Sequence, residues 1–369
     1  MHILVTTDTV GGVWSYTREL VSGLVTRGVR VTLVSFGGVP SRARRSWLAG
    51  LSGVQYYPTS FRLEWMQDSE VDISESCAYL LRVIAECKPD LLHLGQYCFG
   101  SLDVPMPKVV VAHSDVLSWW REVRGEHPRD AWTECYRGIV ARGLAGATVV
   151  AAPSRWMMDT IEDLYGTQRL PRVIYNGCTP ALFHSPVEKQ GIAVSAGRLW
   201  DEGKQMSLIL QLRSSPFPIH LAGALSLTNV LPDFSVVASN KAAHVNYEGE
   251  LGEVEVRELM SRAAIYIAPS KYEPFGLSPL EAALSRCVLV VNDIPSFREI
   301  WGNTALYFRK DDANSLGEVL EQLQADPKLC HEYAGRALQR ALERYTTEQM
   351  VDEYLRLYSA LLERRVSAA

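Results

Sequence analysis

Residues 2–36 read HILVTTDTVGGVWSYTRELVSGLVTRGVRVTLVSF, and this stretch decides the fold class. An apolar, β-branched run at 2–7 predicts a strand, which the turn residues Asp8–Gly12 interrupt. Apolar residues then recur at helical spacing over 13–27, and a second apolar run at 29–36 predicts another strand. Because a helical crossover allows the two strands to run in the same direction, this order predicts a parallel sheet.

The same alternation continues along the chain. Short apolar runs predict further strands at Leu91–Leu94, Lys108–Ala112, Ala147–Ala152, Arg172–Tyr175, Ile192–Ala196, Pro218–Ala222, Ser235–Ala238, His244–Tyr247, Ile265–Ala268 and Val288–Val291. Residues 177–190 contain two prolines and a glycine, which is typical of a linker. We therefore expect two doubly wound α/β domains, residues 1–176 and 191–345, and a helical C-terminal region over Leu338–Arg365.

Composition excludes several classes of function. The chain has 369 residues and a formal net charge of -5, which gives no electrostatic argument for binding nucleic acid. Its seven cysteines show no CxxC pair, so we expect reduced thiols and a cytoplasmic location. The N-terminus opens directly into a strand-like run, unlike a signal peptide, and no apolar run approaches the ~20 residues of a membrane span.

A second stretch, SKYEPFGLSPLEAAL at 270–284, places Glu273 eight residues before Glu281 across the start of an expected helix. Ser278 and Glu281 have the spacing of a capping box, which offers Glu281 a structural role. That role does not account for Glu273, which precedes a proline and is held extended. A helix N-terminus favours an anion, and carboxylates accept hydrogen bonds from hydroxyls. The stretch therefore also fits a diphosphate that carries two polyol groups.

Two cations, Arg198 and Lys204, follow the strand expected at 192–196. A lysine in a first helical turn is unfavourable unless an anion is present, so the pair fits a departing diphosphate. The alternative is a pair of solvated surface charges. Because no Asp-x-Asp motif follows a strand, the sequence implies no metal.

Taken in order, several motifs resemble those of retaining glycosyltransferases of the GT-B fold, family 4. They are Gly11-Gly12, Tyr175-Asn-Gly177 with Phe183, Ser195-Ala-Gly-Arg-Leu199 with Lys204, Tyr247-Glu-Gly249, and Glu273-Pro-Phe-Gly-Leu277 leading to Glu281. The resemblance runs over most of the chain. It implies two Rossmann-like domains facing a central cleft, the first binding the acceptor and the second the donor. A final helix, residues 346–369, is expected to cross back onto the N-terminal domain.

The resemblance also implies roles for single residues. Glu273 is expected to contact the donor sugar, Glu281 the ribose, and Arg198 and Lys204 the diphosphate. Further donor contacts are expected from Gly12, Gly197, Glu250, Leu251, Phe275, Gly276, Leu277 and Ser278. His113, which ends the run KVVVAH, matches the family's sugar-contacting histidine, whereas a lone histidine at a strand end is more often structural. Acceptor contacts are expected from Trp14, Tyr16, Asp115 and Trp119, and the alternative for these four is ordinary core and surface.

The implied reaction moves a hexose from a nucleotide-diphosphate sugar, UDP-glucose by default, to a hydroxyl of a saccharide, lipid-linked or small-molecule acceptor, with retention of configuration. We expect no cofactor and no metal, and a monomer or weak dimer. The basic loop with Arg42, Arg44 and Arg45 beside Trp47 is compatible with contact to an anionic bilayer, although such loops are usually solvated.

Two other functions fit the same sequence. One is a sugar-nucleotide epimerase of the same fold, for which Asp8, Asp115 and Glu122 are the acid–base candidates. The other is a non-catalytic subunit that binds sugar nucleotides. The presence of Glu273 and Glu281 together with both cations argues against a decayed site.

Overall fold

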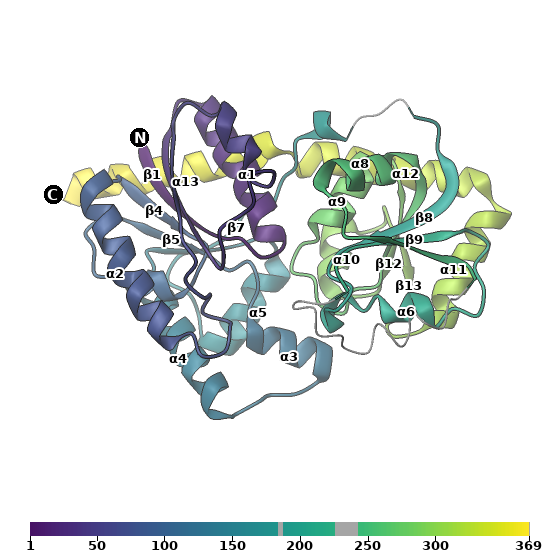
Figure 1. Ribbon diagram of the computed structural model, residues 1–369, viewed down its shortest axis with the longest axis horizontal. Helices are drawn as coiled ribbons and strands as arrows, with labels where there is room; N and C mark the ends of the chain where they lie inside the picture. The colour runs from purple at the N-terminus through teal and green to yellow at the C-terminus, as the bar shows by residue number, and fades with distance from the viewer. Residues whose placement is uncertain (184–186, 226–242, 369) are drawn as a thin grey trace. The chain divides into compact units, whose positions relative to one another are not determined.

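The computed structural model describes residues 1–183, 187–225 and 243–368, which form two α/β units (Figure 1). Unit 1 comprises Met1–Gly177 and Thr347–Ala369, and unit 2 comprises Cys178–Thr346. The first division lies one residue after the predicted domain end at 176, so the residues predicted as a linker fall in unit 2 after Gly177.

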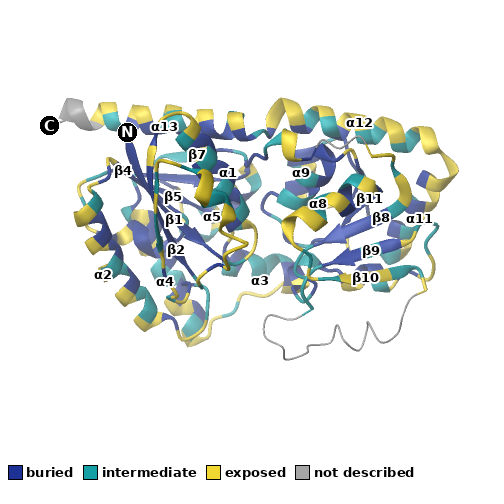
Figure 2. Cartoon of the chain, turned by 45° about the horizontal axis from the view of Figure 1, so that its top comes forward, coloured by how far each residue is buried: buried dark blue, intermediate teal, exposed yellow. Residues whose placement is uncertain are grey.

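Unit 1 is built on a parallel sheet in the order β3-β2-β1-β4-β5-β6-β7. Its strands are β1 (His2–Asp8), β2 (Arg30–Phe36), β3 (Val54–Pro58), β4 (Leu91–Leu94), β5 (Lys108–Val111), β6 (Val149–Ala152) and β7 (Pro171–Val173). Its helices are α1 (Gly12–Thr26), α2 (Glu70–Cys87), α3 (Val116–Arg124), α4 (Ala131–Gly146), α5 (Arg155–Tyr165) and α13 (Thr347–Ala368), with one-turn helices η1 (Ser46–Gly50) and η2 (Cys98–Ser101). Every residue of β1, β4 and β6 is buried, as expected for a parallel sheet covered on both faces (Figure 2).

Unit 2 has a second parallel sheet in the order β10-β9-β8-β11-β12-β13. Its strands are β8 (Gln190–Ala196), β9 (Ile219–Ala222), β10 (Val245–Gly249), β11 (Ala263–Ala268), β12 (Val288–Asn292) and β13 (Leu306–Phe308). Its helices are α6 (Ser207–Leu210), α8 (Glu253–Arg262), α9 (Leu277–Leu284), α10 (Pro295–Trp301), α11 (Ala313–Ala325) and α12 (Pro327–Arg344), with η3 (Pro180–Leu182) and η4 (Glu202–Lys204). The two parallel sheets confirm the predicted α/β class.

The predicted strands within the described residues are present, and the prediction at Ser235–Ala238 lies outside them. Two edge strands, β3 and β13, escaped prediction. β3 has the sequence VQYYP and no buried residue, and β13 has only three residues. Neither edge strand carries the continuous apolar run that identifies a buried parallel strand from sequence.

The helical region expected over Leu338–Arg365 consists of two helices, since α12 ends at Arg344 and α13 begins at Thr347, within one residue of the final helix expected at 346–369. At the break, the Tyr345 hydroxyl donates to the Ile300 carbonyl at 2.8 Å, and the Tyr345 carbonyl accepts from the Cys178 amide at 3.0 Å. α13 then belongs to unit 1, as expected for a helix that crosses back. It packs so closely on α1 that a Cβ on Gly23 would lie 2.6 Å from Val351 Cγ2.

Candidate active site

In unit 2 the strand order changes direction between β8 and β11, and ligands of such sheets bind at the carboxyl ends of the strands flanking this point. The loops that follow the two strands are tied together there. The Lys271 and Tyr272 amides both donate to the Gly203 carbonyl, at 2.9 and 3.2 Å. From the other side, Asn292 Nδ2 donates to the Ser270 carbonyl at 3.1 Å. The loop that carries Glu273 is therefore held from two neighbouring strands.

The start of α9 differs from the capping box predicted from sequence. The N-cap is Gly276, with φ of 93°, and no side chain caps the helix there. Because this left-handed residue turns the chain, α9 begins at Leu277 and Ser278 lies inside the first turn. The capping-box prediction is wrong, and the structural role that it offered Glu281 does not apply. Glu281 is half-buried on α9.

Lys204 and Glu273 form an ion pair between Nζ and Oε2. Their side chains are 21% and 13% exposed, so the pair is accessible to a ligand but largely shielded from water. Lys204 is the last residue of η4 and does not open a longer helix, because Gln205 has a left-handed φ of 49°. Lys204 therefore ends a one-turn helix and does not lie in the first turn of a helix, as the sequence analysis had assumed. The fold nonetheless brings together the lysine and the carboxylate assigned separately to diphosphate and sugar.

Arg198, the second predicted cation, has a carboxylate partner of its own. Its Nη2 lies 2.6 Å from Asp201 Oδ2, and its guanidinium lies 5.5 Å from the centre of the Trp200 ring. Asp201 Oδ1 also accepts from the Gly203 amide at 2.9 Å, which fixes η4. The sequence analysis missed Asp201, although an acidic residue three positions after an arginine is a recognisable signal for such a pair.

Tyr266, which the sequence analysis also missed, lies buried where the predicted donor residues converge. Its hydroxyl donates to the Ala196 carbonyl at 3.1 Å and so links β11 to the end of β8. Burial raises the pKa of Tyr266, a hydrogen bond with Ser278 lowers it, and the charges of Glu273 and Glu281 raise it. The charges of both carboxylates therefore raise the pKa of the same buried tyrosine.

The remaining predicted donor residues lie at the same edge of the sheet. Gly197 follows β8 and donates its amide to the Ala222 carbonyl at 3.0 Å. Glu250 is exposed and Leu251 half-buried in the loop between β10 and α8. Phe275 is 2% exposed, with its ring centre 5.5 Å from that of Tyr345, so its side chain serves packing.

In unit 1, the predicted acceptor residues Trp14 and Tyr16 lie in the core, at 1% and 2% exposed. Trp14 Nε1 donates to the Arg44 carbonyl at 3.1 Å, and the Tyr16 hydroxyl lies 3.1 Å from His93 Nε2. Gly12 is the first residue of α1, after Gly11 with a left-handed φ of 79°. Trp14 and Tyr16 are therefore ordinary core residues, which was the alternative to a role in acceptor binding.

His113 lies just after β5, at the carboxyl edge of the unit 1 sheet. Its ring centre is 4.5 Å from that of Tyr16, with an edge-to-face angle of 67°. Burial lowers the pKa of His113 to about 3, so its imidazole is neutral at pH 7. A neutral ring is suited to a hydroxyl partner rather than to an anion.

Asp115 has a structural role that the acceptor prediction did not anticipate. It caps α3 by accepting from the Ser118 amide at 2.7 Å. It also accepts from the hydroxyls of Tyr165 at 2.7 Å and Tyr136 at 3.2 Å. Burial raises the pKa of Asp115, and these hydrogen bonds oppose that rise. Trp119, on the same helix, is half-buried with its ring 5.7 Å from that of Trp120.

The acidic candidates for an epimerase are used in other ways. Asp8 accepts from the Val10 amide and, at 3.3 Å, from Trp65 Nε1. Glu122 forms an ion pair with Arg121 at 3.0 Å. Asp115 is the buried N-cap of α3. All three candidate carboxylates therefore already have hydrogen-bond or ion-pair partners.

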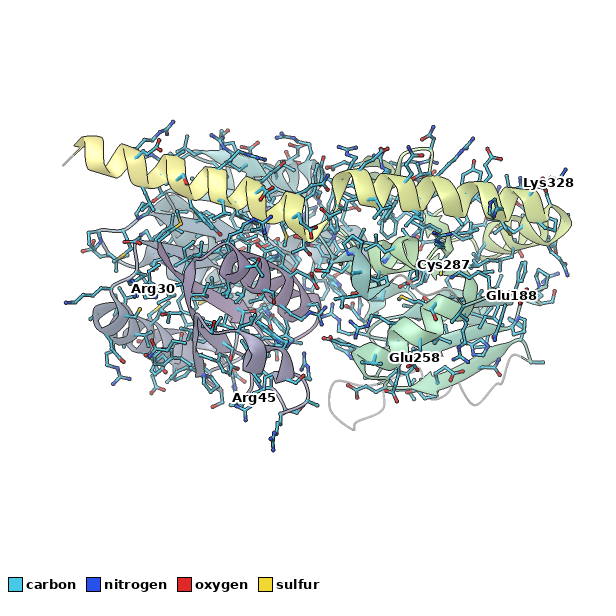
Figure 3. All side chains as sticks on the ribbon, turned by 90° about the horizontal axis from the view of Figure 1, so that it is seen from above. Arg30, Arg45, Glu188, Glu258, Cys287 and Lys328 are labelled. Carbon is cyan, nitrogen blue, oxygen red and sulfur yellow. The ribbon has the colours of Figure 1, made fainter. Side chains whose placement is uncertain are left out.

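The basic loop is partly folded onto unit 1. The Arg44 guanidinium donates to the Thr9 carbonyl at 3.0 Å, and Trp47 packs edge-on to Trp14 at 5.6 Å. Arg45 points away from the ribbon (Figure 3). In the parts of the chain that the structure describes, no helix is long and apolar enough to span a membrane.

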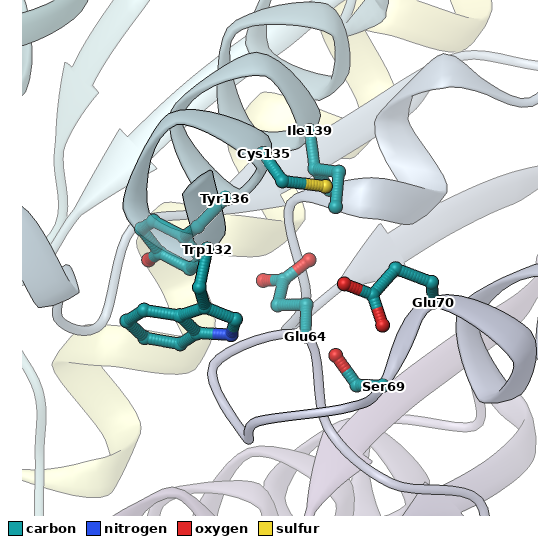
Figure 4. A pocket seen from close by; sticks show the side chains of 7 residues that line it. All are labelled: Glu64, Ser69, Glu70, Trp132, Cys135, Tyr136 and Ile139. Carbon is teal, nitrogen blue, oxygen red and sulfur yellow. The ribbon is translucent and has the colours of Figure 1, made fainter. Parts of the chain in front are cut away.

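A small pocket in unit 1 is lined by Glu64, Glu70 and Trp132 among others (Figure 4). The Glu64 carboxylate accepts from the amides of Tyr97 at 2.8 Å and Cys98 at 2.6 Å, so it anchors η2. We therefore read this pocket as part of the structural core. Over the described residues there is no group of three or more His, Cys, Asp or Glu side chains placed to hold a metal ion.

Comparison with known proteins gives two family matches. Residues 10–182 match the model described as Glycosyltransferase Family 4, and residues 186–340 match Glycosyl transferases group 1. A relative from Mycolicibacterium smegmatis, alpha-maltose-1-phosphate synthase, is 30% identical over 75% of this chain and 76% of its own. A sucrose-phosphate synthase structure from Thermosynechococcus elongatus has a TM-score of 0.80 at 16% identity and covers 99% of this chain and 100% of its own. Anabaena HepE in complex with UDP-glucose has a TM-score of 0.77 at 16% identity and covers 98% and 100%.

Proposed function

The chain belongs to the group 1 glycosyltransferase family, with its two-domain GT-B fold, and from that premise we propose that it transfers a hexose from a nucleotide-diphosphate sugar to a hydroxyl group with retention of configuration. The family membership establishes glycosyl transfer as the class of activity. The donor, the acceptor, the stereochemistry and the absence of a metal requirement are the content of the proposal.

The observation that carries the proposal is the arrangement around the start of α9. Lys204 pairs there with Glu273, which lies eight residues before Glu281 in the chain, at the point where the strand order of unit 2 changes direction. The left-handed Gly276 lets the backbone amides of the first turn point toward an approaching anion. Glu273 and Glu281 then accept hydrogen bonds from the hydroxyls on either side of a diphosphate.

UDP-glucose is the donor we propose, because a protein with the same fold, Anabaena HepE, is known in complex with it. We propose a saccharide acceptor, since the relative from Mycolicibacterium smegmatis is named for a phosphorylated disaccharide product.

The proposed mechanism uses position and charge rather than a covalent intermediate. The leaving diphosphate takes the proton of the attacking hydroxyl on the same face of the sugar, which preserves the configuration. Lys204 and Arg198 stabilise the negative charge that develops on that phosphate, the role a metal ion has in other transferases. Because both cations are paired in the free protein, the ligand phosphate must replace or share Glu273 and Asp201 as their partner.

The test is incubation of the full chain with UDP-glucose, ADP-glucose or GDP-mannose and with glucose, maltose or α-D-glucose 1-phosphate as acceptor. We expect release of nucleoside diphosphate and a product whose anomeric proton shows an α linkage by NMR. A product with a β linkage would contradict retention. A new nucleotide sugar without transfer identifies an epimerase, and binding without turnover identifies a non-catalytic subunit.

A further inference from the structure

Gln96 is a buried residue that neither the sequence motifs nor the proposed mechanism uses. It follows β4 after Gly95, at the carboxyl edge of unit 1, where the strand order changes direction between β1 and β4. Its side chain is 4% exposed. Neither its amide nitrogen nor its amide oxygen has a hydrogen-bond partner among the residues that the structure describes.

His113 Nε2 is a second buried polar atom without a partner in the described chain, and His113 follows the strand next to the one that precedes Gln96. Strands β4 and β5 are adjacent and pair Leu94 with Val110, so the residues that follow them emerge next to each other. The Tyr97 hydroxyl donates to the Ser114 carbonyl at 2.8 Å, which joins the segments that follow Gln96 and His113.

The backbone holds Gln96 in this position. The Gly95 amide donates to Thr6 Oγ1 at 2.9 Å, and a Cβ on Gly95 would lie 2.9 Å from the Thr6 carbonyl oxygen. This contact fixes the segment against β1, so Gln96 cannot readily swing outward. A buried polar group left without a partner carries a desolvation cost, because it has lost its hydrogen bonds with water. Such a cost in a native protein calls for an explanation, and a ligand contact is one.

We propose that Gln96 is a specificity residue of the acceptor site, where its side-chain amide binds a hydroxyl of a saccharide beside His113. This inference rests on the proposed transfer reaction, because it assigns the acceptor to this edge of unit 1. A hydroxyl both donates and accepts, and so satisfies an amide that offers one donor group and one acceptor. A phosphate or carboxylate only accepts and would leave the amide oxygen unpaired.

The first experiment measures transfer from UDP-glucose to glucose, maltose and the monodeoxy analogues of glucose. In Gln96→Met, which keeps the length of the side chain without its polar groups, we expect kcat/KM for the acceptor to fall ~10–200-fold while KM for the donor stays unchanged. The wild type should reject one monodeoxy analogue. The variant should use that analogue as efficiently as it uses glucose. Unchanged acceptor kinetics, or an equal penalty for every analogue in both proteins, would overturn the assignment. Gln339→Met, on the exposed face of α12, is the matched control.

The second experiment needs no turnover and separates this inference from the proposed function. Maltose should raise the melting temperature of the wild type but not of Gln96→Met. If the wild type transfers no sugar yet shows this Gln96-dependent shift, the proposed function fails and the site stands. If transfer proceeds and the maltose shift is the same in both proteins, the site fails and the proposed function stands.

A structural role for Gln96 has its own signature. Since Met removes two buried groups without partners, the melting temperature of Gln96→Met without ligand should equal or exceed that of the wild type. A marked fall would mean that the amide supports the fold, and would count against a binding role.

Discussion

Lys204 and Glu273 pair across the loops that follow β8 and β11, so the cation assigned to the diphosphate is held by the carboxylate assigned to the sugar. The pairing fixes both side chains before a ligand arrives. In the proposed mechanism, the phosphate replaces or shares Glu273 as the partner of Lys204, which leaves the Glu273 carboxylate available to sugar hydroxyls. On that proposal, the ion pair couples recognition of the two parts of the donor.

Lys204→Met should lower kcat more than it weakens donor binding. Charge develops on the leaving phosphate only as the glycosidic bond breaks, and removal of one preorganised partner typically costs ~10²–10³ in rate. Steady-state kinetics with UDP-glucose measure this, with exposed Lys310→Met as the control. A normal kcat with a raised KM alone would place Lys204 outside the groups that stabilise the transition state.

Activity should survive EDTA, because Lys204 and Arg198 supply the positive charge that a metal ion supplies elsewhere. The measurement is the rate of UDP release in excess EDTA, followed by addition of Mg²⁺ or Mn²⁺. Loss of turnover in EDTA that either ion restores would overturn the metal-independent mechanism.

Gly276→Ala should destabilise the protein and impair donor binding together. At φ of 93° a new Cβ would lie 3.2 Å from Glu273 Cγ and 3.2 Å from Phe297 Cε1. A left-handed conformation alone costs a non-glycine residue about 1–2 kcal/mol. Gly335→Ala in α12, where a Cβ meets no atom within 4 Å, should instead stabilise by about 0.5–1 kcal/mol. Urea unfolding compares the two, and equal stability of both variants would contradict the strain argument.

His93 should make the protein less stable as the pH falls below neutrality. Burial, and then electrostatic repulsion with His113 when both rings are protonated, lowers the pKa of His93 to about 3. Because an unfolded histidine titrates near 6.5, the unfolded state binds more protons between these values and stability is lost as the pH decreases. The expected loss from His93 is about 2 kcal/mol between pH 7 and pH 5.

The check on His93 is urea unfolding at both pH values. In His93→Gln the fall in unfolding free energy between pH 7 and pH 5 should be smaller by about that 2 kcal/mol. His331→Gln removes an exposed histidine and should behave as the wild type does. The same fall in all three proteins would show that His93 contributes nothing to the pH dependence.

The sequence predicted the buried strands well because a parallel sheet covered on both faces needs continuous apolar runs, as in β1 and β12. It failed at β3, an edge strand with no buried residue. The pattern over Leu338–Arg365 did not show the break between α12 and α13, since the contacts of Tyr345 with Ile300 and Cys178 are tertiary. The family resemblance, which implied a final helix at 346–369, agrees with α13 at Thr347–Ala368.

For the site, the sequence and the family resemblance selected Glu273 and Lys204 as candidates, but did not show that they contact each other, because 69 residues separate them in the chain. Tyr266 and Gln96 were missed because a tyrosine inside a strand and a glutamine after one are ordinary in sequence. Their significance depends on burial and on hydrogen-bond partners, which only the folded chain shows. The capping-box prediction failed because Gly276, and not Ser278, is the N-cap of α9, so the helix begins before Ser278.

The most direct test of the account is calorimetric titration of Glu273→Gln and Glu281→Gln with UDP-glucose and with UDP. Because α9 lacks a capping box, Glu281→Gln should leave the melting temperature unchanged. It should weaken the binding free energy of both ligands by about 1.5–3 kcal/mol, the value of a lost charge-assisted hydrogen bond to the ribose. Glu273→Gln should weaken the binding of UDP-glucose. The affinity for UDP should stay the same or increase, since the substitution frees Lys204 for the phosphate. Equal losses for both ligands in both variants would contradict the assignment of Glu273 to the sugar and Glu281 to the ribose.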